Sequence, residues 1–258
     1  MSTPNLDLTG KSALVCGASS GIGRATALAL AGLGASVTVL ARRRERLDAL
    51  VAEITAAGGT ADAVTADLDD RPGLLDALGA GRWEILINNT GGPPAGKLIE
   101  ADPSALEAAF GRHVLGAQTL LRLCLPHMHS QGYGRIVNVL STSVREPIPN
   151  LGVSNTIRGA MASWAKSVSK ELAPGLTINN VLPGFTDTER LSSLKSAVAG
   201  RTGSTEDAVY AGWLARVPEG RLGQPEELAG AIAFLVSPAG AYIRGQSLAV
   251  DGGRLNTI

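Results

Sequence analysis

The sequence has little of several residue types, and each shortage excludes a class of protein. Two cysteines, Cys16 and Cys124, are too few for a disulfide framework or a four-thiolate metal site, and we expect buried fillers in a reducing compartment. Aromatic residues make up only 3% of the chain, which disfavours a stacking surface for single-stranded nucleic acid. Lys+Arg and Asp+Glu each number 23, so no net charge attracts nucleic acid or an anionic membrane surface.

Long apolar runs and leader segments are lacking as well. No run of about 18 apolar residues occurs, so we expect no membrane-spanning helix. Residues 1–7 carry no basic segment followed by an apolar run, so we expect no secretory signal and a cytoplasmic protein. What the chain does contain is 45% hydrophobic residues and 32 glycines among its 258 residues. This composition suits one sizeable core with tight turns and close helix packing.

Short β-branched runs alternate with longer helical stretches. We expect strands at 12–16, 36–40, 63–66, 85–87, 135–140, 177–181 and 247–250, and helices at 22–33, 46–56, 103–125, 153–172 and 226–236. This pattern predicts an α/β fold, a single Rossmann-type doubly wound parallel sheet of about seven strands with helices on both faces. No linker divides the chain, so we expect one domain over 1–258. The segment 185–219 breaks the alternation and is interpreted as a substrate lid or as a surface excursion.

The first expected strand leads into a glycine-rich turn and then a helix. Glycines there let the backbone approach a pyrophosphate, and a helix N-terminus supplies N–H donors and a favourable dipole. The strand–turn–helix context supports a dinucleotide site. The residues of this turn that we expect to bind the cofactor are Gly17, Ser19, Ser20, Gly21, Ile22 and Gly23.

The residues after the second expected strand indicate which dinucleotide is bound. An NAD site needs a carboxylate there to accept from the ribose hydroxyls, whereas a 2′-phosphate needs cationic donors. Here Arg42, Arg43 and Arg44 follow the strand, and no acid occurs before Glu45. Arg24 adds a positive charge near the turn. We therefore expect NADP(H) in preference to NAD(H), with Arg42 and Arg43 as the selecting residues.

The glycine spacing is Gly-x-x-x-Gly-x-Gly, and three further signatures accompany it. They are Asn88-Asn89-Thr90-Gly91, Pro183-Gly184 and Asp251-Gly252-Gly253. With these motifs the chain resembles the classical short-chain dehydrogenase/reductase family over nearly its whole length, and most of all its 3-oxoacyl-[acyl-carrier-protein] reductase-like group. The resemblance implies a homodimer or homotetramer. It also implies cofactor contacts from Asp67 and Leu68 at the adenine, Asn89 and Gly91 at the adenosine ribose, and Pro183, Gly184, Thr186 and Thr188 at the nicotinamide or phosphates.

The family pattern fails at the catalytic positions. The family uses a serine, a tyrosine and a lysine, supported by a helix asparagine. Ser141 matches the serine, but Ser154 stands in place of the tyrosine and Arg158 in place of the lysine. His113 stands in place of the asparagine. No tyrosine in the chain is followed four residues later by a lysine, so the pair is missing rather than displaced.

The replacements suggest roles that differ from those of the family. Arg158 shares a helix face with Ser154 and is expected to bind the ribose hydroxyls, but a guanidinium does not give up a proton at a working pH. His113 is the one group of the four that titrates near neutrality. Our hypothesis is that protonated His113 acts as the acid, directly or through Ser154, while Ser141 polarises the carbonyl. The alternative is that His113 only fills space.

These observations leave three functions open, none of them with a metal, and for the enzyme we expect a small-molecule carbonyl or alcohol substrate. The first is an NADP(H)-dependent oxidoreductase that reduces a carbonyl, such as a 3-oxoacyl thioester, a ketone or a quinone-like compound, with a non-standard proton donor. The second is a catalytically inactive NADP(H)-binding homologue that serves as a sensor or subunit. The third is non-redox dehydration or isomerisation with His113 as base. The retained Ser141 favours the first, and the lost tyrosine and lysine favour the second.

Overall fold

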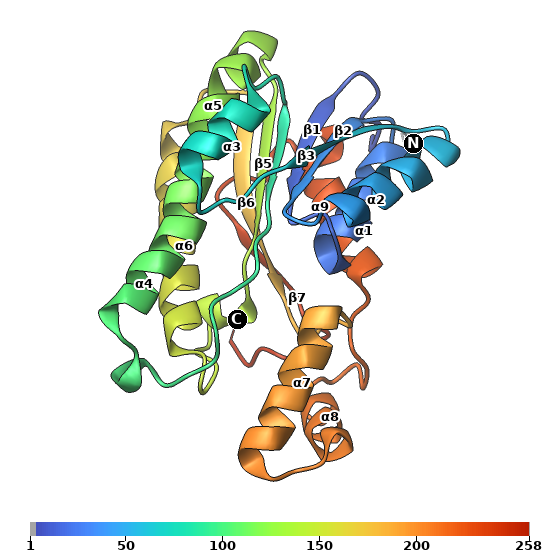
Figure 1. Ribbon diagram of the computed structural model, residues 1–258. Coiled ribbons are helices and arrows are strands. Elements are labelled where there is room, and N and C mark those ends of the chain that lie inside the picture. Colours follow the sequence, from blue (N-terminus) through green and yellow to red (C-terminus); the bar gives the residue numbers. More distant parts are fainter. Residues whose placement is uncertain (1–3, 258) are drawn as a thin grey trace.

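A parallel sheet lies between two layers of helices in the computed structural model, which describes residues 4–257 (Figure 1). Its strands within these residues pair in the order β3-β2-β1-β4-β5-β6-β7, every pair parallel. The expected doubly wound sheet of about seven strands is therefore confirmed. The strand bounds are β1 (Ser12–Cys16), β2 (Ser36–Ala41), β3 (Thr60–Thr65), β4 (Ile85–Asn88), β5 (Gly134–Val139), β6 (Leu176–Pro183) and β7 (Ser247–Val250).

The helices cover both faces of this sheet, and two of them extend beyond it (Figure 1). One face carries α1 (Gly21–Gly32), α2 (Arg44–Ala56) and α9 (Pro225–Val236). The other carries α3 (Arg71–Leu78), α4 (Pro103–Phe110), α5 (Gly116–Gln131) and α6 (Gly152–Glu171). The helices α7 (Glu189–Thr202) and α8 (Glu206–Leu214) project from one end of the sheet.

Alternating side chains of β1 pack into both layers of the core. Ala13 and Val15 pack into the cluster formed with α1, α2 and α9, whereas Leu14 and Cys16 pack into the cluster formed with α3, α5 and α6. Cys124 lies in this second cluster too, and burial raises the pKa of its thiol to about 12. Both cysteines are buried and unpaired, as the sequence predicts.

The single helix expected over 103–125 with its exit at Pro126 is wrong. The segment forms α4, a π-helical turn (Gly111–Leu115) and α5, and α5 continues past Pro126 to Gln131. Proline removes one intrahelical hydrogen bond, to the carbonyl four residues earlier. Both Pro126 and Arg122, which owns that carbonyl, lie on the exposed face, where water takes over the bond. The helix ends instead at Gly132, whose φ of 59° is left-handed.

Three helices were not expected from the sequence, and each begins at a side-chain cap. The caps are Asp70, which accepts from the Gly73 N–H of α3, Thr188, which accepts from the Leu191 N–H of α7, and Thr205, which accepts from the Ala208 N–H of α8. The segment 185–219 is thus mostly helical. The other expected strands and helices are present, with bounds within about three residues of those predicted.

The strand order fixes where a ligand site lies. From β3 the chain crosses to β4 on the far side of β1, so the order reverses between β1 and β4. In open α/β sheets ligands bind at such a switch point, beyond the carboxyl ends of the strands. Here the loops after β1, β4, β5 and β6 meet at that end.

Candidate functional site

The glycine-rich turn joins β1 to α1 at the switch point. Gly17 and Gly21 have φ of 62° and 54°, the left-handed region that favours glycine. A Cβ on Gly23 would collide with the carbonyl oxygen of Gly17, so the turn closes only with glycine there. Ser20, the N-cap of α1, makes no side-chain capping bond. The first-turn N–H groups of α1 therefore have no side-chain cap and are available to an anion.

Arg43 is the arginine that reaches this turn. Its guanidinium donates to the hydroxyls of Ser19 and Ser20, at 2.8 and 2.9 Å from Nη2. Arg42 instead lies 3.5 Å from a carboxylate oxygen of Asp67. Arg24, expected to add charge to the turn, forms its ion pair with Glu53 on α2. The structure thus places one of the two predicted selecting residues, Arg43, directly on the predicted phosphate turn.

The loop after β4 packs against the same turn. Asn89 donates from Nδ2 to the Gly17 carbonyl at 3.4 Å, and a Cβ on Gly17 would lie 2.6 Å from the Asn89 carbonyl oxygen. Behind it, side chains of β4, β5 and β6 form a hydrogen-bonded ladder in register, Asn88 to Asn138 to Asn180, each at 2.8 Å. The ladder ties the ends of these strands together and fixes the loop that carries Asn89.

The predicted residues after β6 complete this side of the site. Pro183, Gly184, Thr186 and Thr188 line one cavity, and Gly21 packs against Thr188, with 3.0 Å between an added Cβ and the Thr188 methyl group. Leu68 does not line this cavity but a small hollow behind it. Asp67 is held at Arg42, so it lies at the β2 end of the site.

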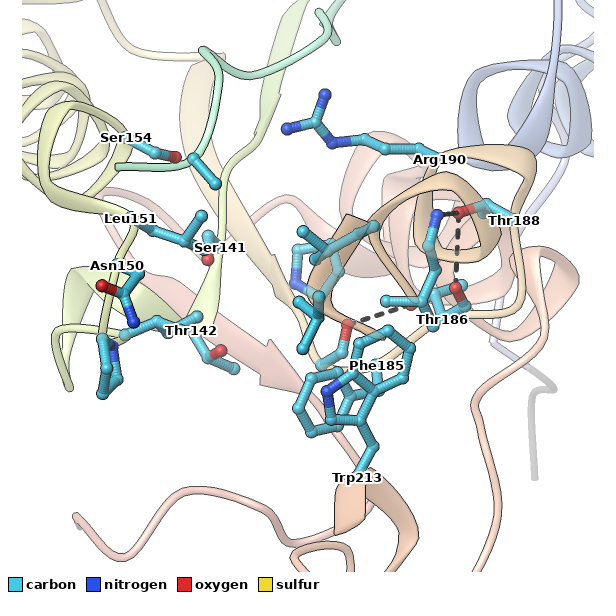
Figure 2. A pocket seen from close by; sticks show the side chains of 18 of the residues that line it. Ser141, Thr142, Asn150, Leu151, Ser154, Phe185, Thr186, Thr188, Arg190 and Trp213 are labelled. Carbon is cyan, nitrogen blue, oxygen red and sulfur yellow. Dashed lines mark hydrogen bonds between the residues drawn. The ribbon is translucent and has the colours of Figure 1, made fainter. Parts of the chain in front are cut away.

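The cavity has a volume of about 620 Å³ and lies between the sheet end and the α7–α8 segment. Figure 2 shows Ser141, Thr142, Asn150, Leu151 and Ser154 on one side and Phe185, Thr186, Thr188, Arg190 and Trp213 on the other. Asn89 and Ile22 also line it, so the glycine turn and the predicted catalytic region open into one space.

Three of the four predicted catalytic residues line this cavity: Ser141, Ser154 and Arg158. Ser141 begins a short 3-10 turn (Thr142–Val144), where its Oγ accepts from the Ser143 N–H at 3.0 Å. Its hydroxyl hydrogen is left free to be donated. Ser154 is 8% exposed on α6.

Arg158 is fixed by the backbone of two strand ends. It donates to the carbonyls of Val139 at 2.8 Å and Thr90 at 3.3 Å, while its Nε has no partner. Burial, followed by the charge of Arg190, lowers the pKa of its guanidinium to about 10. Arg158 therefore still carries its charge at neutral pH, against the cavity wall.

His113, the predicted acid, lies behind the cavity rather than in its wall. It lies in the π-helical turn between α4 and α5 and lines only the small hollow behind the cavity, next to Arg158. Burial lowers the pKa of its imidazole to about 3, with further lowering from the charges of Arg158, Arg112 and Arg190. A neutral imidazole behind the cavity counts against the hypothesis that protonated His113 is the acid.

No other group of suitable pKa takes over that role. The described cavity lining contains no tyrosine, lysine, histidine, aspartate or glutamate. The Tyr133 hydroxyl donates to the Val236 carbonyl, and neither residue lines the cavity. Tyr242 is fully exposed. Hydroxyls and arginines are the polar side chains that face a ligand, apart from the amides of Asn89 and Asn150.

Sequence reasoning missed several residues of the site. Arg190 of α7 donates to the Gly92 carbonyl at 3.2 Å and so reaches from α7 to the loop after β4. Phe185 stacks on Trp213, with ring centroids 5.2 Å apart. Arg254, near the C-terminal end, lines the same cavity. Within 185–219, the aromatic residues Phe185 and Trp213 stand among charged residues and are a sequence signal of inward-facing side chains.

Within 4–257, no group of three or more His, Cys, Asp or Glu side chains is placed to hold a metal ion. No helix in that range combines the length and apolarity needed to cross a bilayer.

A parallel sheet with a glycine-rich turn at its switch point, opening into a cavity, defines a dinucleotide-binding α/β protein. Comparisons with known proteins identify the family. The family model described as "Enoyl-(Acyl carrier protein) reductase" matches residues 17–254. A 3-oxoacyl-[acyl-carrier-protein] reductase of Synechocystis sp. is 37% identical over 258 residues, which cover 95% of this chain and 97% of the relative. The chain belongs to the classical short-chain dehydrogenase/reductase family.

Solved structures agree with this assignment. A putative NAD(P)-dependent gluconate 5-dehydrogenase from Beutenbergia cavernae with bound NADP has a TM-score of 0.89 at 32% identity, covering 99% of this chain and 100% of that one. An L-sorbose reductase from Gluconobacter frateurii, complexed with NADPH and L-sorbose, has a TM-score of 0.91 at 26% identity, covering 98% and 100%.

Proposed function

We propose that this chain is an NADP(H)-dependent oxidoreductase that reduces a carbonyl compound without the tyrosine and lysine of its family. The observation that carries the proposal is that Ser141 and Ile22 of the glycine turn line the same cavity. A carbonyl bound at Ser141 thus shares one space with whatever the turn binds. The relatives with bound NADP or NADPH support the cofactor.

The residues present fit NADP(H). Arg43 with Ser19 and Ser20 offers a cation and two hydroxyls for a 2′-phosphate, and the uncapped first turn of α1 offers N–H donors for the pyrophosphate. Asn89 and Thr188 border the same space. When bound, NADPH supplies a hydride. The chain's own residues therefore act on the carbonyl oxygen of the substrate, which gains negative charge and then a proton.

Ser141 and the buried arginine act on that oxygen. Ser141 donates its free hydroxyl hydrogen to the oxygen, and the Arg158 charge in the cavity wall stabilises the developing alkoxide. Because no side chain in the wall has a suitable pKa, water delivers the proton, with Ser154 as a relay. Such a site suits activated carbonyls such as quinones, 1,2-diketones or 3-oxoacyl thioesters, which need little help from an acid.

The second function, an inactive NADP(H)-binding sensor or subunit, is favoured by one observation: the described cavity lining has no conventional acid. The third function, with His113 as base, loses support because His113 lies behind the cavity. The α7–α8 segment as a substrate lid, a single domain and a homodimer or homotetramer remain part of the proposal.

Turnover distinguishes the first two functions. We expect NADPH consumption, followed at 340 nm, with at least one member of a panel of quinones, 1,2-diketones and 3-oxoacyl thioesters. Ser141→Ala should lower kcat by about 100- to 1,000-fold, as expected for loss of an oxyanion donor. Thr202→Ala, a hydroxyl of the same cavity on α7, serves as control. Tight NADPH binding without turnover on any substrate would contradict the oxidoreductase and support the sensor.

A further inference from the structure

The charge of the cavity wall has one sign. Five arginines line it and, among the described lining residues, no aspartate or glutamate does; they are Arg158, Arg190, Arg201, Arg216 and Arg254. The whole chain carries no net charge, so this excess is local to the cavity. A concave site of one charge raises the local concentration of an oppositely charged ligand.

Two of the five lie on the side of the expected cofactor and are bound to backbone there. Arg158 donates to the Val139 and Thr90 carbonyls, and Arg190 donates to Gly92. The other three come from the end of α7, the segment after α8 and the segment after β7. Among the described residues, Arg201 and Arg216 make no ion pair with a carboxylate. They are free to meet an anion.

Arg254 is held in place beside Ser141. Its Nη1 donates to the hydroxyl of Thr142 at 2.7 Å, and its guanidinium carbon lies 4.9 Å from the centre of the Phe185 ring. Figure 2 shows Phe185 and Trp213 across the cavity from Thr142, so Arg254 spans these two sides. Its Nε is buried with no hydrogen-bond partner. A fixed guanidinium with unused donors is suited to a planar carboxylate.

The acids nearest to Arg254 do not neutralise it by direct contact. Asp251 accepts from the backbone N–H groups of Gly253 and Leu255, and Glu146 accepts from that of Asn256. Neither carboxylate lines the cavity. The wall near α7 and α8 also has an apolar part, formed by Leu191, Leu194, Val198 and the Phe185–Trp213 stack.

We propose that the substrate is an oxo carboxylic acid with an apolar body, whose carboxylate is bound by Arg254 and Arg216 beside Ser141. This substrate class rests on the proposed function. The bound carboxylate fixes the orientation of the substrate in the cavity. Ser141 then donates a hydrogen bond to the carbonyl oxygen, and the apolar body packs against α7 and α8.

Binding tests this proposal separately from turnover. With the protein saturated in NADP⁺, aromatic and aliphatic 2-oxo and 3-oxo acids are titrated beside their methyl esters, which differ only in charge at the carboxyl group. Tryptophan fluorescence reports binding, because Trp213 lies in the cavity wall. The best acid should bind about 10- to 100-fold more tightly than its ester, the range expected for hydrogen bonds to a charged group.

Arginine variants test which residues cause the preference for acid over ester. Arg254→Gln and, separately, Arg216→Gln should remove most of the preference for acid over ester, whereas Arg122→Gln on the exposed side of α5 should leave it unchanged. Arg216 is exposed, so its variant is not expected to disturb folding. Esters binding as tightly as acids, or no saturable binding of any acid, would overturn the proposal even if neutral ketones are reduced. Arg254→Gln weakening NADPH itself to the same extent would place the arginine in the cofactor site and would also overturn it.

Discussion

Ser154 and Arg158 lie one turn apart on α6, and burial decides what each contributes. Arg158 keeps its charge while bonded to two backbone carbonyls, so it acts as a fixed cation rather than a proton donor. Ser154 faces the cavity but has no acid beside it. Under the proposed function, the absence of the family's tyrosine and lysine changes the source of the proton, while Ser141 and Arg158 keep a hydroxyl and a positive charge in the cavity wall.

His113 gives a prediction at this scale, on stability. Its pKa is about 3 in the folded chain, against an ordinary value of 6.5 for histidine. Below pH 6.5 the imidazole binds a proton in the unfolded chain but not in the folded chain. The contribution of His113 to the free energy of unfolding is therefore fully present above pH 6.5 and is lost as the pH falls toward 3. Between pH 6.5 and 4.5, wild type should lose about 2–3 kcal/mol of unfolding free energy more than His113→Asn. Urea denaturation at the two pH values measures this, and equal losses would show that His113 is not buried in a neutral state.

Prediction from sequence was uneven among these residues. Gly17, Gly23, Arg43 and Ser141 are recognisable because their chemistry depends on chain neighbours, namely a strand, a turn and a helix. The properties of His113 depend on burial and on arginines distant in sequence, which no local pattern encodes. Arg190 and Arg254 were missed for the same reason, since each reaches the site from an element far along the chain.

At the scale of elements, the turn between β1 and α1 gives the site its shape. Strand and helix positions were predictable from short apolar runs that alternate with helical stretches, because β1 is buried on both faces and α1 packs on one of the two core clusters. The π-helical turn was not predictable, since its apolar spacing is that of an ordinary helix. Nor were α7 and α8, where charged residues hide a weak apolar pattern and the caps Thr188 and Thr205 are the main signals.

Gly23 provides the prediction for this element. A methyl group at Gly23 would collide with the Gly17 carbonyl oxygen, so Gly23→Ala must displace the turn. We expect a loss of about 1–3 kcal/mol in stability and at least a tenfold weaker affinity for NADPH. Gly32→Ala, in the same helix with nothing within 4 Å of the added carbon, is the matched control. It should leave NADPH affinity unchanged, and an equal loss in both variants would show that close packing at Gly23 is not the cause.

At the scale of the whole molecule, positive and negative side chains are unevenly distributed, although the chain has no net charge. Among the described residues, the cavity wall is lined by arginines and by no aspartate or glutamate, whereas most other arginines form ion pairs or hydrogen bonds, such as Arg44 with Asp48. The overall charge of zero therefore conceals a local excess of positive charge in the cavity wall. Two anions fit this arrangement, a cofactor phosphate at Arg43 and a substrate carboxylate at Arg254.

The most direct test of the account is the affinity of the purified protein for NADPH and NADH, measured by fluorescence titration on wild type, Arg43→Ala and Arg44→Ala. Arg43 contacts the phosphate turn, whereas Arg44 is paired with Asp48 on α2. Wild type and Arg44→Ala should bind NADPH at least about tenfold more tightly than NADH, and Arg43→Ala should lose that preference through weaker NADPH binding alone. Equal affinity for the two nucleotides in wild type, or no binding of either, would contradict the account.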